Sequence, residues 1–336
     1  MLIQENYNLK TKNTFGLNVS AKYFCEICTL AELREVLVQM QEERILFLGG
    51  GSNILFTKNF DGCILQYNRK GISTLDEDKD SILLEVFAGE LWDDFVAYCV
   101  RNNYYGIENM SLIPGTVGAA PIQNIGAYGQ ELKDTFFAVN GIYLDSLSER
   151  TFFKSGCNFD YRSSIFKHEL KNKFLITSVV FRLKKSHQLN THYGSIEQEL
   201  KNTGKKNPTL ADIRNIVIKI RQEKLPDPRE LGNCGSFFKN PEIEKDIYEK
   251  LKELFPSLKG FPVSENTVKI PAGWLIEQSG WKGKRIGNVG VHEHQALVLV
   301  NYGGAEGTEV IQLAQKIKED VFQRFEIKLE EEVNIV

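Results

Sequence analysis

The sequence predicts an α+β protein of two or three domains. Its 336 residues exceed the length at which a single hydrophobic core usually keeps growing. Segments with the period of a strand and segments with the period of a helix alternate along the chain, and the turn-forming stretch Lys224–Pro228 interrupts them. We therefore expect a larger domain before this stretch and a smaller α+β domain after it.

The N-terminal elements form a predicted β-α-β unit. A capping box at Thr29 and Glu32 begins a helix with one apolar face, and apolar runs at residues 22–28 and 44–48 predict strands on either side of it. The same patterns predict further elements before Lys224. The predicted strands span residues 82–88, 136–144, 149–153 and 174–183, and the predicted helices are residues 91–102 and a helix capped by Thr209.

The last third of the chain has the pattern of a smaller α+β unit. Pro271 is typical of a first helical position, and apolar alternation in the tail predicts a final strand. The predicted helices span about 242–254, 271–278 and 308–325, and the predicted strands span 296–300 and 327–336.

Composition excludes several classes of function. With 41 basic and 44 acidic residues the net charge is -3, so no overall attraction to nucleic acid or to a membrane surface is expected. No signal peptide or apolar run long enough to span a membrane is present, and the expected location is the cytoplasm. Cys25 and Cys28 lie three apart on a predicted strand and so point to opposite faces, and His292 and His294 lack further ligands; no metal site is expected.

Two glycine-rich stretches are candidate ligand-binding loops. Gly49-Gly50-Gly51-Ser52-Asn53 directly follows a predicted strand, where glycines let backbone N–H groups approach an anion. The stretch 114–129 offers a second such surface within a long segment that has neither helix nor strand period. Neither dinucleotide nor P-loop fingerprints are present. Two loops suggest an extended ligand such as a dinucleotide, and two purely structural loops are the alternative.

Two further segments carry candidate chemistry. In Gly235-Ser236-Phe237-Phe238 a hydroxyl lies between a flexible glycine and two aromatic residues, which fits either a site or a tight turn. Arg162 lies among residues that could pack around it, and a guanidinium is suited to holding a carboxylate, although an ordinary surface arginine would have the same pattern.

These motifs, in this order, resemble the UDP-N-acetylenolpyruvoylglucosamine reductases over almost the whole chain. The motifs that carry the resemblance are Asn13–Gly16, Gly49–Asn53, Ile113–Gly115, Asn124–Gly129, Tyr161-Arg162-x-Ser164-x-Phe166, Lys224–Asp227, Gly235–Pro241 and Leu329–Val333. The resemblance implies an α+β fold in which two subdomains of the vanillyl-alcohol-oxidase type bind FAD and a third domain binds substrate. The implied boundaries are 1–222 for the FAD-binding region, with subdomains of about 1–70 plus 326–336 and about 71–222, and 223–325 for the substrate-binding domain.

The resemblance also implies residue roles. Arg162 and Glu332 would polarise a substrate carboxylate, and Ser236 would donate a proton. The implied FAD-binding residues are Gly49, Gly50, Gly51, Ser52, Asn53, Ile54, Ile113, Pro114, Gly115, Gly118, Asn124, Gly126, Ala127 and Tyr128. The implied substrate contacts are Tyr161, Tyr193, Arg221, Lys224, Asn240, Lys269 and Gln295, where Tyr193 belongs to the tyrosine loop of the longer form of the family.

The implied reaction is the NADPH-dependent reduction of a UDP-sugar enolpyruvyl ether to UDP-N-acetylmuramate through non-covalent FAD, carried out by a monomer that binds neither nucleic acid nor membrane. One departure is Phe261-Pro262, where some members have a tyrosine before the proline, so a hydrogen bond from that hydroxyl is absent. Two alternatives remain at this point: an FAD-dependent alcohol oxidase of the same fold, and a binding module for a nucleotide sugar without enzymatic activity.

Overall fold

The computed structural model describes residues 2–186, 188–205 and 207–336. The chain forms two compact units, of which the first comprises Met1–Tyr7, Ala21–Gly50 and Asp61–Gln222 and the second Asn8–Ser20, Gly51–Phe60 and Glu223–Val336. The segment 223–325 thus lies in one unit with the tail 326–336 and with two short segments from the first 70 residues.

The first unit begins with a four-stranded sheet in the order β1-β2-β5-β3. The capping box at Thr29 is present at the start of α1 (Leu30–Gln39), whose Leu33 and Val36 are buried. The predicted strands on either side of α1 are confirmed, but β5, which the apolar pattern did not reveal, lies between them and pairs in parallel with β3. The strand bounds are β1 (Ile3–Asn8), β2 (Ser20–Ile27), β3 (Ile45–Phe47) and β5 (Phe60–Tyr67).

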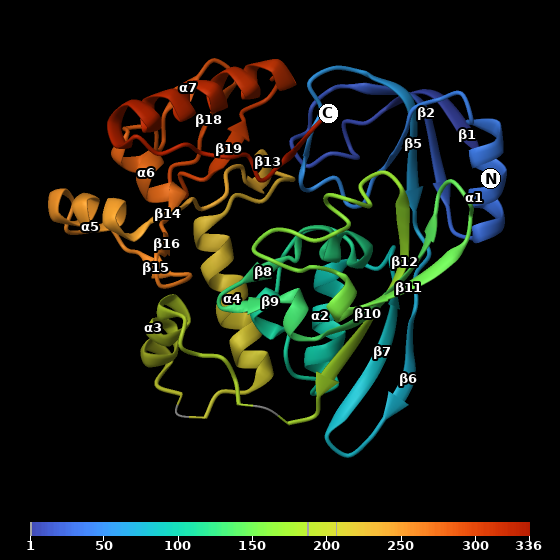
Figure 1. The fold of residues 1–336 in the computed structure, drawn as a ribbon, viewed down its shortest axis with the longest axis horizontal. Coiled ribbons are helices and arrows are strands. Elements are labelled where there is room, and N and C mark those ends of the chain that lie inside the picture. The colour runs from blue at the N-terminus through green and yellow to red at the C-terminus, as the bar shows by residue number, and fades with distance from the viewer. Residues whose placement is uncertain (1, 187, 206) are drawn as a thin grey trace. The chain divides into compact units, whose positions relative to one another are not determined.

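A five-stranded antiparallel sheet forms the rest of the first unit's framework (Figure 1). Its order is β11 (Glu149–Phe153), β10 (Phe136–Tyr143), β12 (Phe174–Lys184), β7 (Ser81–Phe87) and β6 (Ile72–Glu77). Helix α2 (Trp92–Arg101) and the 3-10 helix η2 (Val117–Gln123) cover one face, where Trp92, Phe95 and Phe181 pack with ring centroids 4.8 to 6.0 Å apart.

Shorter elements complete the first unit. Helices α3 (Gly194–Thr203) and α4 (Leu210–Lys224) share a separate small apolar cluster around Ile196 and Ile213. The remaining short elements are β8 (Gly126–Ala127), β9 (Gln130–Glu131), η1 (Glu108–Met110), η3 (Leu132–Asp134) and η4 (Lys154–Gly156).

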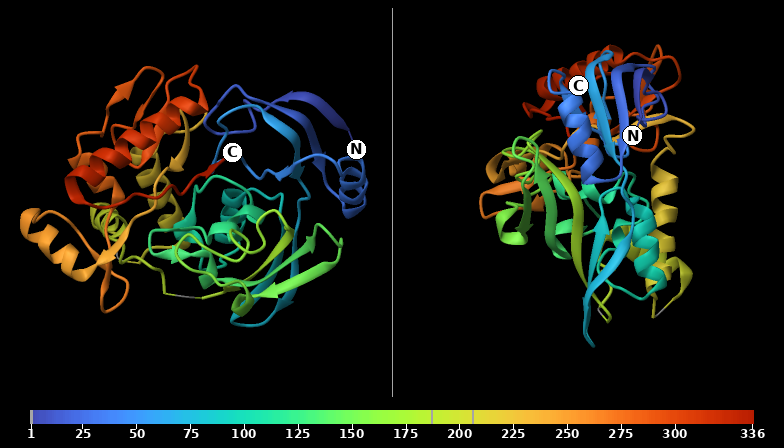
Figure 2. Two further views of the ribbon diagram at one scale, coloured as in Figure 1. Left: turned by 45° about the horizontal axis from the view of Figure 1, so that its top comes forward. Right: turned by 90° about the vertical axis from the view of Figure 1, so that its right-hand side faces the viewer.

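The second unit is built on a four-stranded sheet in the order β13-β19-β18-β17. Helices α6 and α7 pack with this sheet around one core, and α7 is the long red ribbon in Figure 2. A three-stranded sheet in the order β14-β16-β15 carries α5. The bounds are β13 (Gly232–Ser236), β14 (Glu242–Glu244), α5 (Lys245–Leu254), β15 (Phe261–Pro262), β16 (Thr267–Lys269), α6 (Ala272–Gln278), β17 (Arg285–Ile286), β18 (Val289–Val291), β19 (Val298–Asn301) and α7 (Gly307–Phe325).

Three boundary predictions in this unit need correction. The segment predicted as a helix from residue 242 begins with strand β14, because Glu242–Glu244 pairs with β16. Pro271 is the N-cap residue of α6, one position before its first turn. The tail alternates between buried and exposed residues as predicted, but it pairs only at the Glu331 bridge and at β20 (Asn334–Ile335), which lies parallel to β4 (Ile54–Leu55).

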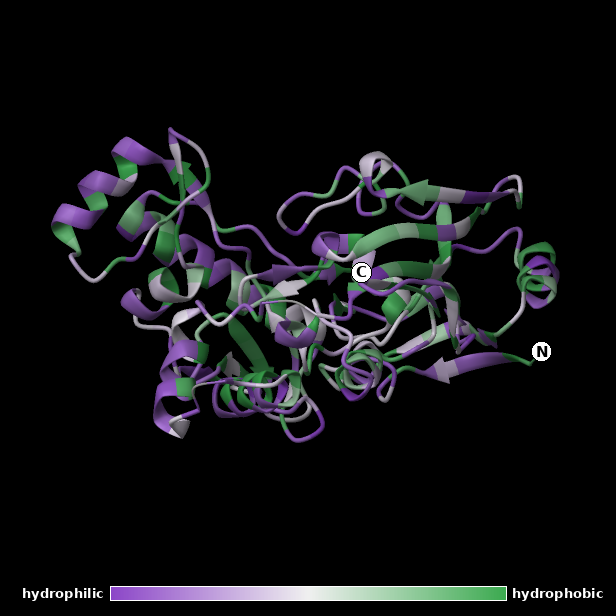
Figure 3. Ribbon diagram, turned by 90° about the horizontal axis from the view of Figure 1, so that it is seen from below, coloured by the Kyte–Doolittle hydropathy of each residue, from purple (hydrophilic) through white to green (hydrophobic). Residues whose placement is uncertain are grey.

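The helices carry both hydrophilic and hydrophobic residues along their length, as expected for helices with one buried face (Figure 3). None of the helices in the described part of the chain combines the length and the apolar character that a membrane crossing requires.

Candidate functional site

Two glycine-containing loops of the first unit lie in direct contact. A Cβ atom added at Gly50 would lie 2.9 Å from the Cα of Gly115, and one added at Gly49 would lie 3.0 Å from Thr116 Oγ1. Side chains at these glycines would therefore push the two loops apart. Within the described residues, the amides of Gly50 and Gly115 donate no hydrogen bond to another protein group. The two surfaces that the sequence predicted separately thus form one backbone cradle, here called the glycine cradle (residues 49, 50, 115 and 116).

The second loop of the glycine cradle is fixed to the sheet and to α2. The Trp92 amide donates to the carbonyl of Gly115 over 3.0 Å, and the Gly118 amide donates to the carbonyl of Ala88 over 3.0 Å. A Cβ atom at Gly118 would lie 2.5 Å from that of Ala88, so this approach also requires glycine. Ile113 packs against the core of the unit beside this loop.

An ion pair that the sequence did not reveal holds the start of the same loop. Leu112, which precedes Ile113, has a φ of 60°, and its amide donates to the carboxylate of Asp93. The Arg214 guanidinium donates two hydrogen bonds, of 2.7 and 2.8 Å, to the two oxygens of Asp93. Burial alone would raise the pKa of Asp93, but Arg214 and the Leu112 amide outweigh it and hold the pKa below its ordinary value.

Arg162 is held by the loop that contains Asn124 and Gly126. Its Nη2 donates to the carbonyl of Gly126 over 2.8 Å, and its backbone has a φ of 52°. Such a conformation is uncommon for a residue other than glycine, and it often marks a functional position. Lys167 Nζ donates to the Arg162 carbonyl over 3.1 Å. The predicted packing around Arg162 is therefore present.

The other members of the Arg162 motif anchor it. Ser164 Oγ donates to the carbonyl of Ile122 over 2.7 Å, Phe166 is buried, and the Arg162 guanidinium lies over the ring of Tyr161 with 5.3 Å to its centroid. Asn124 is fully buried, and its side chain bonds to Glu131, Asp160 and Lys133. The Asn124 side chain thus shapes the loop.

Tyr128, Tyr193 and Arg221 form a cluster in the first unit. The rings of Tyr128 and Tyr193 meet edge to face with centroids 5.3 Å apart, and Tyr193 is 46% exposed. Burial raises the pKa of Tyr128 and lowers that of the neighbouring Arg221, whose buried Nε has no hydrogen-bond acceptor in the described residues. Asn109 Nδ2 donates to the carbonyls of Tyr128 and Asn190, at 2.8 and 2.9 Å, and so joins the tyrosine loop to the Tyr128 loop.

In the second unit, Gly51 to Ile54 lie against the C-terminal segment. A Cβ atom at Gly51 would lie 2.0 Å from the carbonyl oxygen of Lys12. Asn53 Nδ2 donates to the carbonyl of Glu332 over 3.4 Å, and Asn334 Nδ2 donates to the carbonyl of Asn53 over 3.0 Å. This glycine loop and the predicted catalytic glutamate are therefore neighbours in the fold.

The segments of Ser236 and Glu332 pair with each other. The Glu332 amide donates to the carbonyl of Phe237 over 2.8 Å, and the Lys239 amide donates to the carbonyl of Glu330 over 2.9 Å. Phe237 and Phe238 are buried. Burial raises the pKa of the nearby Cys234 thiol, and the charge of Glu332 raises it further. Two of the three predicted catalytic residues are thus brought together, and Arg162 belongs to the first unit.

The two glutamates that precede Glu332 are each paired with a lysine. Lys318 of α7 lies 2.8 Å from Glu331, and Lys239 lies 3.2 Å from Glu330. Both of these carboxylates therefore have a cationic partner within the second unit.

The predicted substrate contacts in the second unit lie in different settings. Lys224 is exposed at the end of α4, Asn240 Oδ1 accepts from the Ala272 amide at the start of α6 over 3.0 Å, and Lys269 lies 3.2 Å from Glu242. Gln295 is half-buried, with its Oε1 beside Gly273. The described residues contain no group of three or more His, Cys, Asp or Glu placed to hold a metal ion.

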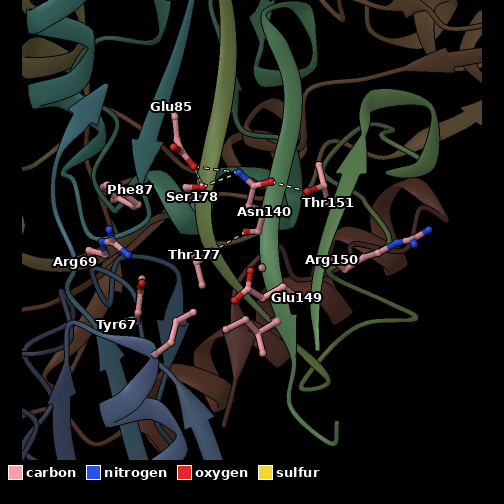
Figure 4. A pocket seen from close by; sticks show the side chains of 13 residues that line it. Tyr67, Arg69, Glu85, Phe87, Asn140, Glu149, Arg150, Thr151, Thr177 and Ser178 are labelled. Carbon is pink, nitrogen blue, oxygen red and sulfur yellow. Dashed lines mark hydrogen bonds between the residues drawn. The ribbon is translucent and has the colours of Figure 1, made fainter. Parts of the chain in front are cut away.

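A separate cavity of about 300 Å³ is lined by residues of β7, β10, β11 and β12 together with Leu30, Tyr67 and Arg69 (Figure 4). Its lining includes none of the predicted site residues. Ser178 Oγ donates to Glu85 over 2.6 Å, and Thr151 Oγ1 donates to Asn140 Oδ1 over 2.7 Å. Since these groups satisfy one another, the cavity adds nothing to the predicted chemistry.

Comparisons with known proteins found relatives that match this chain over its whole length. A family model described as UDP-N-acetylenolpyruvoylglucosamine reductase, C-terminal domain, matches residues 227–336, and one described as FAD binding domain matches residues 21–142. The UDP-N-acetylenolpyruvoylglucosamine reductase of Flavobacterium johnsoniae is 50% identical over 337 residues, which cover 100% of both chains. That of Pseudomonas aeruginosa is 45% identical over 335 residues, covering 99% of this chain and 98% of its own.

A solved structure shows the same fold. The crystal structure of UDP-N-acetylenolpyruvylglucosamine reductase from Thermus caldophilus matches with a TM-score of 0.69 at 22% identity, covering 100% of this chain and 99% of the other.

Fold and sequence together define the class of protein: the chain is an FAD-dependent oxidoreductase that joins an FAD-binding domain to a further α+β domain. The glycine cradle fits FAD, because the amides of Gly50 and Gly115 have no acceptor among the described residues and can donate to a pyrophosphate. The chain belongs to the UDP-N-acetylenolpyruvoylglucosamine reductase family, which confirms the resemblance seen in its motifs.

Proposed function

We propose that this chain reduces UDP-N-acetyl-3-O-(1-carboxyvinyl)-glucosamine to UDP-N-acetylmuramate with electrons from NADPH, a step of peptidoglycan precursor synthesis. Membership of the family supports this reaction. The observation in the structure that carries it is the pairing of the Ser236 segment with the Glu332 segment, because it joins a hydroxyl and a carboxyl group from distant parts of the chain.

FAD, when bound, supplies the hydride chemistry of the reaction, and NADPH supplies the electrons. We assign the contacts with FAD to the residues of the glycine cradle and of the adjoining loops. These are Gly49, Gly50, Gly51, Ser52, Asn53, Ile54, Ile113, Pro114, Gly115, Gly118, Asn124, Gly126, Ala127 and Tyr128.

Arg162 and Glu332 are proposed to hold the substrate carboxylate. Negative charge that develops beside this carboxylate during reduction is stabilised by a preorganised guanidinium more strongly than the ground state is. Loss of such a donor costs about 3 kcal/mol in related oxyanion sites. The hydrogen bonds that hold Arg162 to the Gly126 loop support preorganisation of this kind.

Ser236 is proposed to donate the proton that completes the reduction. A hydroxyl is a weak acid in water, but the enolate-like carbon that it would protonate is strongly basic. The burial of Phe237 and Phe238 beside it supports a fixed position for the hydroxyl.

The remaining contacts are proposals of the same kind. We assign the contacts with substrate to Tyr161, Tyr193, Arg221, Lys224, Asn240, Lys269 and Gln295. We further propose that residues 1–222 with the tail 326–336 bind FAD and that residues 223–325 bind substrate. The net charge of -3 gives no reason to expect a nucleic acid or membrane partner, and we propose a monomer that works in the cytoplasm, where NADPH and nucleotide sugars are made.

Anaerobic half-reactions test the proposal. Adding NADPH to the purified yellow protein should bleach its flavin absorbance. Adding the enolpyruvyl sugar nucleotide should then restore the absorbance, and mass spectrometry should detect UDP-N-acetylmuramate as the product. A protein that NADPH does not reduce, but that an alcohol does, would instead be an oxidase. A colourless protein that binds the sugar nucleotide would be a binding module.

A further inference from the structure

The side chain of Asn233 lies where the Ser236 segment meets the loop that follows Lys224. Asn233 is only 5% exposed, and its amide uses both N–H donors and one lone pair of its oxygen. Nδ2 donates to the carbonyls of Pro226 and Leu231, at 3.1 and 2.9 Å, and Oδ1 accepts from the Gly235 amide at 2.9 Å. A buried amide that makes three hydrogen bonds to the backbone holds its partners firmly.

The bond to Gly235 fixes an irregular turn directly before Ser236. The pairing of β13 with β19 shifts register between Asn233 and Ser236, and Gly235 has a φ of 74°. After this bulge Ser236 pairs with Val298. Since a bulge re-aims the side chain that follows it, the conformation of Gly235 sets the direction of the Ser236 hydroxyl.

The backbone of Asn233 is also held on both sides. Thr14 Oγ1 donates to the Asn233 carbonyl over 2.6 Å, and the Asn233 amide donates to the carbonyl of Thr14 over 3.0 Å. These two bonds hold the Asn233 backbone in place, and the side chain that contacts Pro226 and Gly235 is therefore attached to a fixed part of the chain.

We propose that Asn233 is a positioning residue for the reaction, which sets the Ser236 hydroxyl through Gly235 and the Lys224–Asp227 loop through Pro226. This inference rests on the proposed function, since it takes Ser236 as the proton donor. No other side chain of similar size offers two donors and one acceptor in this shape. A carboxylate at position 233 would instead face two carbonyl oxygens.

Asn233→Asp tests the inference, with Asn301→Asp as a matched control. Asn301 is also buried in the second unit, donates to the carbonyl of Phe15 over 2.8 Å and accepts from the amides of Gly303 and Ala305, but its loop leads to α7. In Asn233→Asp we expect reoxidation of the reduced flavin by substrate to slow at least tenfold, with a larger solvent deuterium isotope effect. Flavin reduction by NADPH should stay within twofold of the parent rate, and Asn301→Asp should leave the isotope effect unchanged.

A second pair of variants serves if Asn233→Asp does not fold. A Cβ atom at Gly235 would meet no atom within 4 Å, so Gly235→Ala strains only the backbone. We expect Gly235→Ala to slow reoxidation and Gly235→Asn, which tolerates a positive φ better, to restore part of the rate. Parent-like reoxidation and isotope effects in these variants would overturn the inference. If Ser236→Ala itself keeps full activity, the proposed function fails instead.

Discussion

The backbone amide of Glu332 donates a hydrogen bond of 2.8 Å to the carbonyl of Phe237. Because Phe237 directly follows Ser236, this bond joins the segment of the proposed proton donor to that of the proposed carboxylate-binding glutamate. Phe237 is fully buried, so the junction is anchored in the core of the second unit. Rigid support of this kind keeps reacting groups in a productive geometry.

Ser236→Ala should separate the two half-reactions. We expect reoxidation of the reduced flavin by substrate to slow at least about 100-fold, the usual contribution of a positioned proton donor. Flavin reduction by NADPH should change little, since it needs no proton from Ser236. Stopped-flow absorbance measures both rates, with Ser146→Ala in an exposed turn as the control. Equal losses in both half-reactions would contradict proton donation by Ser236.

Substitutions of Glu332 should reveal the form in which it works. If the carboxyl group is protonated and donates a hydrogen bond to substrate, Glu332→Gln keeps a donor and should retain more activity than Glu332→Ala. Glu331→Gln is the control, because Glu331 pairs with Lys318 at a half-exposed position where an ion pair contributes about 1 kcal/mol or less. Steady-state kcat measures the order of the variants. Lower activity in Glu332→Gln than in Glu332→Ala would exclude a donor role.

Gly50→Ala should weaken FAD binding. The new Cβ atom would lie 2.9 Å from the Gly115 Cα, so the two loops of the glycine cradle must separate. We expect at least a tenfold higher Kd for FAD, about 1.4 kcal/mol, in titrations of the apoprotein followed by flavin fluorescence. Gly156→Ala is the control, since its nearest new contact is an ordinary 3.8 Å from Phe152. Unchanged FAD affinity in Gly50→Ala would place the cofactor elsewhere.

Asp93→Asn should lower stability in a pH-dependent way. The folded pKa of Asp93 lies below its ordinary value, so its stabilising effect is present above about pH 4 and is lost as the pH falls through the folded pKa. We expect the free energy of unfolding to fall by about 2 kcal/mol at pH 7 and by less at pH 3.5. Urea denaturation measures both values. Asp94→Asn, at an exposed position of the same helical turn, should have little effect at either pH; a pH-independent loss in Asp93→Asn would rule out this charge effect.

Among the described elements, local patterns predicted every α-helix except α3 but missed more than half of the strands, and some of these failures have local causes. Helix α3 was not predicted because Ile196 is its only buried residue, so it has no apolar face to detect. Strand β13 was not predicted because Asn233 and Gly235 read as turn formers, although they form a bulge within a strand. Asp93 and Arg214 gave no signal, since each lies among ordinary charged residues of a helix.

The sequence by itself determined the residue types of the cofactor loops and of the Ser236 and Arg162 motifs, because glycines, capping residues and turn formers act through the backbone beside them. Only the tertiary structure decided which of these segments meet. Gly50 contacts Gly115, and Phe237 accepts from Glu332, because the buried cores of the units fix how distant strands and loops align. Such long-range pairing depends on packing of the whole unit, which no local pattern encodes.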